Sequence, residues 1–137
     1  MNRLELIELD ESKAYQLPYA PAIKVPVDAE YVFLSGAVGA TDADAYPDDV
    51  VEQTRAVMRR HTNALAAHGL GWDDVVHVYE FLTDMRDTVD VHITMAEFTG
   101  DSGWKPANTL IGVNALSRPG ARFELDVIAA RMPGTRS

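Results

Sequence analysis

The sequence contains no cysteine. Disulfides, thiolate metal ligands, thiol nucleophiles and iron–sulfur clusters are therefore excluded together. No run approaches the roughly 18 consecutive apolar residues that a membrane-spanning helix needs. The opening segment, MNRLELIELDESK, carries charges from position 3 onward in place of the apolar stretch of a signal peptide. Both absences favour a cytoplasmic protein without a membrane partner.

Positive charge is also scarce. Lys and Arg number 12 against 21 Asp and Glu, which gives a net charge of −9. A surface of this charge repels phosphate backbones, and no basic cluster along the chain counters it. We therefore expect no nucleic-acid partner, and a ribonuclease activity is disfavoured.

What is present is the composition of one folded domain. The chain has 137 residues, of which 47% are hydrophobic and 24% charged. We expect a single domain over residues 1–132 and a disordered tail over residues 133–137. Six segments have the pattern of strands: 4–9, 23–27, 31–36, 75–82, 109–116 and 122–130. The last two flank Ser-Arg-Pro-Gly at 117–120, which predicts an antiparallel hairpin.

Two helices are predicted between these strands. Asp48 or Asp49 caps the first helix, and Gly69 ends it. Its apolar face contains, at helical spacing, Val51, Thr54, Met58, His61, Leu65 and His68. The second helix follows Asp84 and Asp87 and has two apolar stripes, Val89/Ile93/Ala96 and Val91/Met95/Phe98. The order β-β-β-α-β-α-β-β predicts an α+β fold in which both helices pack on one face of a mixed sheet.

The second face of this sheet needs another explanation. In the last strand, Phe123, Leu125, Val127 and Ala129 form one apolar face, whereas Glu124, Asp126 and Ile128 point the other way. A face that carries both apolar residues and acids, with no helix to cover it, is typically buried in an oligomer.

Carboxylates are the first candidates for chemistry. Glu124 and Asp126 lie two residues apart on a strand, so both side chains emerge on one face about 7 Å apart. Such a pair acts as acid and base or positions a water molecule; alternatively, it forms ion pairs with Arg118, Arg122 or a partner chain. Glu80 lies within an apolar strand, where an unpaired carboxylate is costly, so we expect a salt bridge or a subunit contact there.

The remaining polar candidates are weaker. The histidines at 61, 68, 77 and 92 lack the spacing of a metal site, and no glycine-rich phosphate loop is present, so we expect no metal. His61 and His68 are expected in the core or an interface, whereas His92 either faces a cleft or is solvated. Tyr19, close to Pro18 and Pro21, is either a pocket residue or an aromatic at the rim of the core.

Several segments together carry a family resemblance. They are LPYAPAIK at 17–24, VFLSG at 32–36, QTR at 53–55, GLGWDDVV at 69–76, PANT at 106–109 and FELDVIAA at 123–130. In this order they resemble the RidA/YjgF family of enamine/imine deaminases. The resemblance implies a chorismate-mutase-like fold and a homotrimer with a central barrel and ligand clefts at the subunit interfaces. It also implies hydrolysis of a small-molecule imine or enamine without a cofactor or metal.

The resemblance also implies roles for individual residues. Tyr19 matches a tyrosine that closes the site, Ser35 and Gly36 match a pair that lines the cleft, and Glu124 matches a glutamate that positions the attacking water. The family's carboxylate-binding arginine does not carry over, because Asn108 stands in its place.

Asn108 can donate and accept hydrogen bonds but has no charge. Losing a charge-assisted contact removes about 1.5 to 3 kcal/mol of binding, which argues against 2-aminoacrylate as the substrate. His92 and Lys105 are candidates for a replacement cation. The sequence thus predicts a Rid-like hydrolase of another imine or enamine, with a non-catalytic trimer that binds a small metabolite as the alternative.

Overall fold

The computed structural model describes residues 5–7, 19–40, 46–100 and 105–131. Its strands are β1 (Glu5–Ile7), β2 (Ala22–Lys24), β3 (Glu30–Val38), β4 (Val75–Leu82), β5 (Ala107–Gly112) and β6 (Phe123–Arg131). Its helices are α2 (Val50–Ala67) and α3 (Thr88–Thr99), with short 3₁₀ turns η1 (Trp72–Asp74) and η2 (Met85–Asp87). This is the predicted order of strands and helices. The predicted tail at 133–137 lies outside the described residues.

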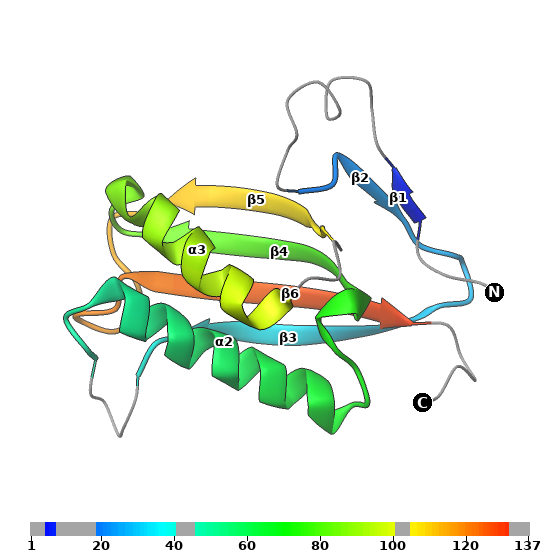
Figure 1. Cartoon of the computed structure of the whole chain (residues 1–137), viewed down its shortest axis with the longest axis horizontal. Helices are drawn as coiled ribbons and strands as arrows, with labels where there is room; N and C mark the ends of the chain where they lie inside the picture. The colour runs from blue at the N-terminus through cyan, green and yellow to red at the C-terminus, as the bar shows by residue number, and fades with distance from the viewer. Residues whose placement is uncertain (1–4, 8–18, 41–45, 101–104, 132–137) are drawn as a thin grey trace.

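Four strands form the main sheet in the order β3-β6-β4-β5. β6 runs antiparallel to both of its neighbours, and β5 runs parallel to β4. β1 and β2 pair with each other as a separate antiparallel ribbon. Figure 1 shows α2 and α3 side by side over the same face of the main sheet. The predicted α+β architecture, a mixed sheet with two helices on one face, is confirmed.

The predicted hairpin between 109–116 and 122–130 is wrong. β5 pairs with β4, with Val78 beside Asn108, whereas β6 lies between β3 and β4. The reason is that α3 connects β4 to β5, and a helical crossover returns the chain in the same direction. The segment after Gly112 is longer than a hairpin turn and carries the chain past β4 before β6 begins at Phe123.

The core lies between the helices and the sheet. The Asp49 side chain caps α2 by accepting a hydrogen bond of 2.9 Å from the backbone N–H of Val51. Beneath α2, the predicted inward face of β6 is fully buried, including Phe123 and Leu125. His61 is buried as expected, with Nε2 2.6 Å from the carbonyl oxygen of Leu125.

Of the two locations expected for His68, the core is wrong. His68 is exposed, because α2 ends at Ala67 and the chain turns away there. On α3, Val91 is buried with Met95 and Phe98 packed against the core, but Val89 and Ile93 are 66% and 63% exposed. α3 meets the sheet on one side only, so its second apolar stripe faces outward.

No helix of the described residues covers the second face of the sheet. Tyr31 and Phe33 on β3 are 51% and 71% exposed there, and their rings stack with centroids 5.9 Å apart. His77 and Tyr79 on β4 stack in the same way, at 4.3 Å. We call this surface the open face. The expected homotrimer would cover it, and that assembly stays a prediction.

Candidate functional site

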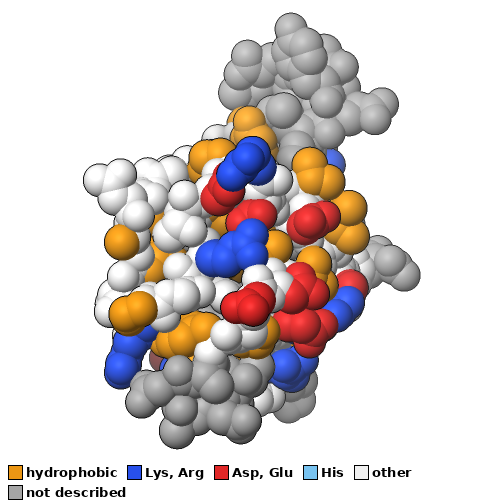
Figure 2. Space-filling model, turned by 90° about the vertical axis from the view of Figure 1, so that its left-hand side faces the viewer, with side chains coloured by type: hydrophobic (Ala, Val, Ile, Leu, Met, Phe, Trp, Pro, Cys, Tyr) orange, Lys and Arg blue, Asp and Glu red, His pale blue; other side chains and the backbone are white. Residues whose placement is uncertain are grey.

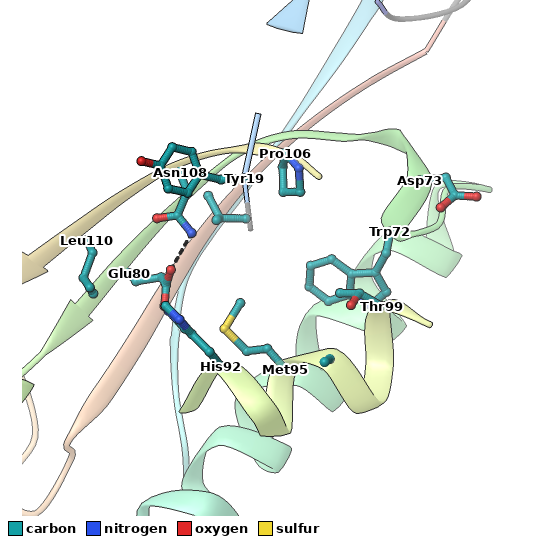
Figure 3. Close-up of a pocket in the computed structure, with 12 residues that line it drawn as sticks. Tyr19, Trp72, Asp73, Glu80, His92, Met95, Thr99, Pro106, Asn108 and Leu110 are labelled. Atoms are coloured by element: carbon teal, nitrogen blue, oxygen red, sulfur yellow. Dashed lines mark hydrogen bonds and ion pairs between the residues drawn. The ribbon is translucent and has the colours of Figure 1, made fainter. Parts of the chain in front are cut away.

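A cavity of about 430 Å³ lies between α3 and the helix-covered face of β4 and β5. Its walls are Tyr19, Trp72, Asp73, Val78, Glu80, His92, Met95, Ala96, Thr99, Pro106, Asn108 and Leu110. Figure 3 shows that most of these side chains are apolar or aromatic, whereas Glu80, His92 and Asn108 gather at one end. An apolar pocket with a few convergent polar groups is the usual form of a small-molecule site.

Glu80 is the centre of the polar end. Its side chain has no solvent exposure. One carboxylate oxygen, Oε1, accepts from Nε2 of His92 at 2.8 Å, and Oε2 accepts from Nδ2 of Asn108 at 2.5 Å. Of the salt bridge or subunit contact expected for Glu80, the structure shows a partner within the chain: His92, which forms a salt bridge with Glu80 when its imidazole is protonated. Because each oxygen has a donor, the cost of burying this carboxylate is offset.

Three elements bring these side chains together. Alternation along β4 turns Val78 and Glu80 toward the helices, and the parallel register of β5 places Asn108 beside Val78 on the same face. Asp84 caps η2, since its side chain accepts from the backbone N–H of Arg86, and η2 leads directly into α3. α3 then carries His92 over Glu80.

The charge state of His92 depends on Glu80. The hydrogen bond to Glu80 raises the pKa of His92 above its ordinary value, and the carboxylate's charge adds to this, against the opposing effect of partial burial. The protonated pair has no net charge. Because Nε2 donates to Glu80, Nδ1 is the nitrogen left to exchange a proton with a ligand. The His92 side chain is 39% exposed, so the imidazole is accessible from solvent.

Tyr19 and Lys105 lie on segments that a backbone hydrogen bond joins, but only Tyr19 lines the cavity. The backbone N–H of Ala20 donates to the carbonyl oxygen of Pro106 at 3.1 Å, which fixes the segment carrying Tyr19 next to β5. Tyr19 lines the cavity and is 38% exposed. Lys105 is half-buried and is not among the residues that line the cavity. The structure therefore brings Tyr19, His92 and Asn108 to one cavity and leaves Lys105 outside it.

The other predicted site residues lie on the open face. In the antiparallel register Glu124 is opposite Phe81, whereas Glu80 is opposite Leu125, so Glu124 and Glu80 point to opposite faces of the sheet. Ser35 and Gly36 lie at an irregularity of β3 between Leu34 and Ala37. The predicted site is thus divided between two sheet faces within one chain.

Gly36 lies directly against the two acids. A Cβ atom there would be 2.4 Å from Oε2 of Glu124 and 2.4 Å from Oδ1 of Asp126, so only glycine fits without a shift. Burial and the neighbouring Asp126 charge raise the pKa of Glu124. Within the described part of the chain, Oδ1 of Asp126 is buried without a hydrogen-bond partner. Arg122, an expected partner of these acids, binds Asp87 at 2.8 Å instead.

Sequence reasoning missed part of the cavity. Glu80 was identified only as a carboxylate in need of a partner, and Trp72 and Met95 were not predicted as lining residues. One signal was available for Glu80: an acid at an inward position of a strand requires donors nearby, and such donors usually belong to a site. The indole Nε1 of Trp72 donates to Oγ1 of Thr62 at 2.9 Å, a contact that no local pattern reveals.

Other kinds of site find little support in the described residues. Over residues 5–7, 19–40, 46–100 and 105–131, no group of three His, Asp or Glu side chains is placed to hold a metal ion. Within the same ranges, neither helix is long and apolar enough to cross a bilayer. Figure 2 shows basic and acidic side chains interspersed over the end of the molecule where β4 and β5 finish, without a continuous basic patch on that side.

Comparison with known proteins gives a consistent result. The family described as Endoribonuclease L-PSP matches residues 11–131. Protein DfrA of Myxococcus xanthus is 35% identical over 82% of this chain and 84% of its own. The 2-iminobutanoate/2-iminopropanoate deaminase of Mus musculus is 31% identical over 85% of this chain and 83% of its own. The solved structure of YyfB from Yersinia pestis, a protein of the Rid family, shares the fold with a TM-score of 0.77 at 19% identity, covering 93% of this chain and 98% of that one.

Proposed function

The chain belongs to the Endoribonuclease L-PSP family, which includes the YjgF and Rid proteins, and we propose that it hydrolyses reactive imines or enamines to a carbonyl compound and ammonia. The observation that carries this proposal is the convergence of His92 and Asn108 on the buried Glu80 at the polar end of an apolar cavity. The name of the mouse relative, an iminobutanoate and iminopropanoate deaminase, supports the reaction class.

The reaction needs proton transfer at two atoms. Water adds to the carbon of the C=N bond, so that a C–O bond forms while the nitrogen takes a proton. The resulting carbinolamine then breaks its C–N bond: ammonia leaves with a further proton, and the hydroxyl proton is released as the carbonyl forms. A positioned acid–base group accelerates such steps, typically by about 10²- to 10⁴-fold.

His92 is the acid–base group that we assign in the cavity. Its Nε2 is held by Glu80, so Nδ1 gives a proton to the imine nitrogen and takes one back as the carbinolamine collapses. Glu80 is a positioning residue, because its side chain has no exposed surface. Asn108 uses Nδ2 for Glu80 and keeps its Oδ1 to accept from an N–H of the substrate. Tyr19 closes the cavity beside β5.

Glu124 is proposed to position the attacking water, with Ser35 and Gly36 lining the same part of the site. Since these three residues lie on the open face, this role requires a homotrimer in which the open face of one subunit meets the cavity of the next. The exposed aromatic pair Tyr31 and Phe33 supports such an assembly, because large exposed apolar surfaces usually mark an interface.

The proposed substrate is not 2-aminoacrylate. Asn108 has no charge for a carboxylate, and the charge of His92 is compensated by Glu80. Lys105 would have to turn toward the cavity to act as the replacement cation, since it is not one of the lining residues.

A non-catalytic protein that binds a small metabolite is the second candidate. One observation favours it: Glu80 has no exposed surface and Glu124 faces away, so among the described residues no exposed carboxylate of this chain lies beside Asn108 to activate water. This reading keeps the fold and the cavity but assigns them to ligand binding alone.

Ammonia release from imines generated in situ by an amino-acid or amine oxidase separates the two candidates. The wild-type chain should accelerate release, and H92Q should lose about 10²-fold of that acceleration. V89A, which changes an exposed position on the same helix, is the matched control and should keep the wild-type rate. If the wild-type chain gives only the protein-free rate for every imine, the hydrolase proposal fails and the binding protein remains.

A further inference from the structure

Among the described residues that line the cavity, no cation is free to bind an anion. Its ionisable walls are Tyr19, Asp73, Glu80 and His92. Protonated His92 is paired with Glu80, and this pair is neutral. Asp73 adds a negative charge near the opposite end, beside Trp72. The described lining residues therefore carry a net negative charge, whatever the protonation state of His92.

The remaining walls favour a bulky apolar group. Trp72, Met95 and Leu110 face the same space from η1, α3 and β5. The Trp72 indole is anchored, because its Nε1 donates to Oγ1 of Thr62 and its ring packs against the core. A cavity of about 430 Å³ holds a ligand far larger than a three-carbon imino acid.

We propose that this cavity takes an imine without a carboxylate, carrying a large apolar or aromatic group that packs against Trp72 and Met95. Its C=N group then lies at the polar end, beside Asn108 and His92. The inference deepens the proposed hydrolysis and depends on it only for the fate of the ligand; the choice of ligand depends on the cavity alone.

The charges of the lining residues explain why an imine without a carboxylate is preferred. A carboxylate brought to the polar end would meet the buried Glu80, and no described lining residue carries a guanidinium or ammonium to offset the repulsion. Like charges at close range are strongly unfavourable. A neutral imine avoids this cost, and its protonated form is attracted to Glu80 and Asp73. The imine would thus be one made by oxidation of a primary amine, and hydrolysis would give an aldehyde and ammonia.

A matched pair of stable ligands tests the ligand class without catalysis. Phenylacetamide and phenylacetate have the same ring and nearly the same shape, but only phenylacetate is charged. Their binding is followed by the fluorescence of Trp72 in a W104F background, which removes the only other tryptophan. Phenylacetamide should bind at least about tenfold more tightly than phenylacetate. Equal affinities, tighter phenylacetate binding, or no binding of either compound would overturn the inference.

Two substitutions sharpen this result. N108R supplies the missing cation and should reverse the order, so that phenylacetate binds more tightly. V89R, at an exposed position of α3 that does not line the cavity, places the same charge outside it and should leave the order unchanged. The wild-type comparison needs neither variant, so a variant that fails to fold leaves the primary test intact.

An activity comparison distinguishes the two proposals. Phenethylamine with an amine oxidase gives the carboxylate-free imine, and phenylalanine with an amino-acid oxidase gives the imino acid with the same ring. Acceleration of ammonia release should be greater for the amine-derived imine. If phenylacetamide is preferred but neither imine is accelerated, hydrolysis is refuted while the ligand class stands. If the imino acid is the better substrate, hydrolysis stands and the ligand class is refuted.

Discussion

The carboxylates on the two faces of the four-stranded sheet differ in their burial and in their hydrogen-bond donors. Glu80, on the helix-covered face, has no exposed surface, yet both of its oxygens have donors. Glu124 and Asp126, on the open face, are less deeply buried, but Oδ1 of Asp126 has no hydrogen-bond partner among the described residues. Burial alone therefore does not show which carboxylate destabilises the fold. The number of hydrogen-bond donors that reach its oxygens does.

This difference indicates which face is complete within one chain. The helix-covered face contains its own donors and its own cavity, and it is organised before any ligand arrives. The open face has exposed aromatic rings and acids that repel each other. Its charges are of the kind that a second subunit would have to satisfy.

The largest effect is expected from removing a donor to Glu80. N108L keeps the approximate volume but leaves one oxygen of a buried carboxylate without its donor, which should lower the free energy of unfolding by about 3 kcal/mol. T109V removes a hydrogen bond of 3.2 Å to His77 on the open face and is the matched control, with an expected loss of about 1 kcal/mol or less. Urea denaturation at pH 7 measures both. Equal losses would show that the two faces do not differ.

The pKa values of the histidines on the two faces should be shifted in opposite directions. Glu80 raises the pKa of His92 above 6.5, whereas burial lowers the pKa of His77 below it. NMR of histidine-labelled protein should show this order, and E80Q should lower the pKa of His92 without changing that of His77.

The same shift makes stability depend on pH. Because the pKa of His92 is higher in the folded state, the His92–Glu80 pair stabilises the fold fully below pH 6.5 and loses this contribution as pH rises through the folded-state pKa. The stability difference between wild type and H92Q should therefore shrink as the pH rises above 6.5. A difference that grows with pH would contradict the assignment of the pair.

The smallest effect is expected on the open face. E124Q removes one of two neighbouring charges, and because the site is partly exposed and screened, the free energy of unfolding at pH 7 should rise by only about 0.5 kcal/mol. The raised pKa of Glu124 means that the wild-type residue stabilises the fold when protonated and loses this as pH rises, so the gain in E124Q should vanish below pH 4.5. D28N, at an exposed turn, makes the same change in net charge and should show no such gain. A loss of stability in E124Q would indicate that Glu124 is already paired.

The sequence predicted the parts of the molecule that local rules determine. Alternation along β6 placed Phe123 and Leu125 inward and Glu124 outward, and Asp49 marked the start of α2. The pairing of β5 was not predictable in this way, because Ser-Arg-Pro-Gly has the composition of a hairpin turn whether or not a hairpin forms. Strand order depends on contacts between distant segments, and here the crossover through α3 decided it.

The sequence predicted several residues of the site but not how they are arranged. Tyr19, His92 and Asn108 were candidates from the sequence, and they line one cavity. That Glu80 joins His92 to Asn108 could not be predicted, since it requires the register of β4 against β5 and the placement of α3 over both. The separation of Glu124 from Asn108 has the same origin, because only the strand register shows that they point to opposite faces.

The most direct test of the account is to find out which face holds a ligand, and each face carries one histidine that can report on it. His92 lies in the cavity and His77 on the open face. Adding phenylacetamide to histidine-labelled protein should shift the imidazole signals of His92, and by more than any shift at His77. Shifts at His77 with none at His92 would contradict the account, because the ligand would then occupy the face that the helices leave uncovered.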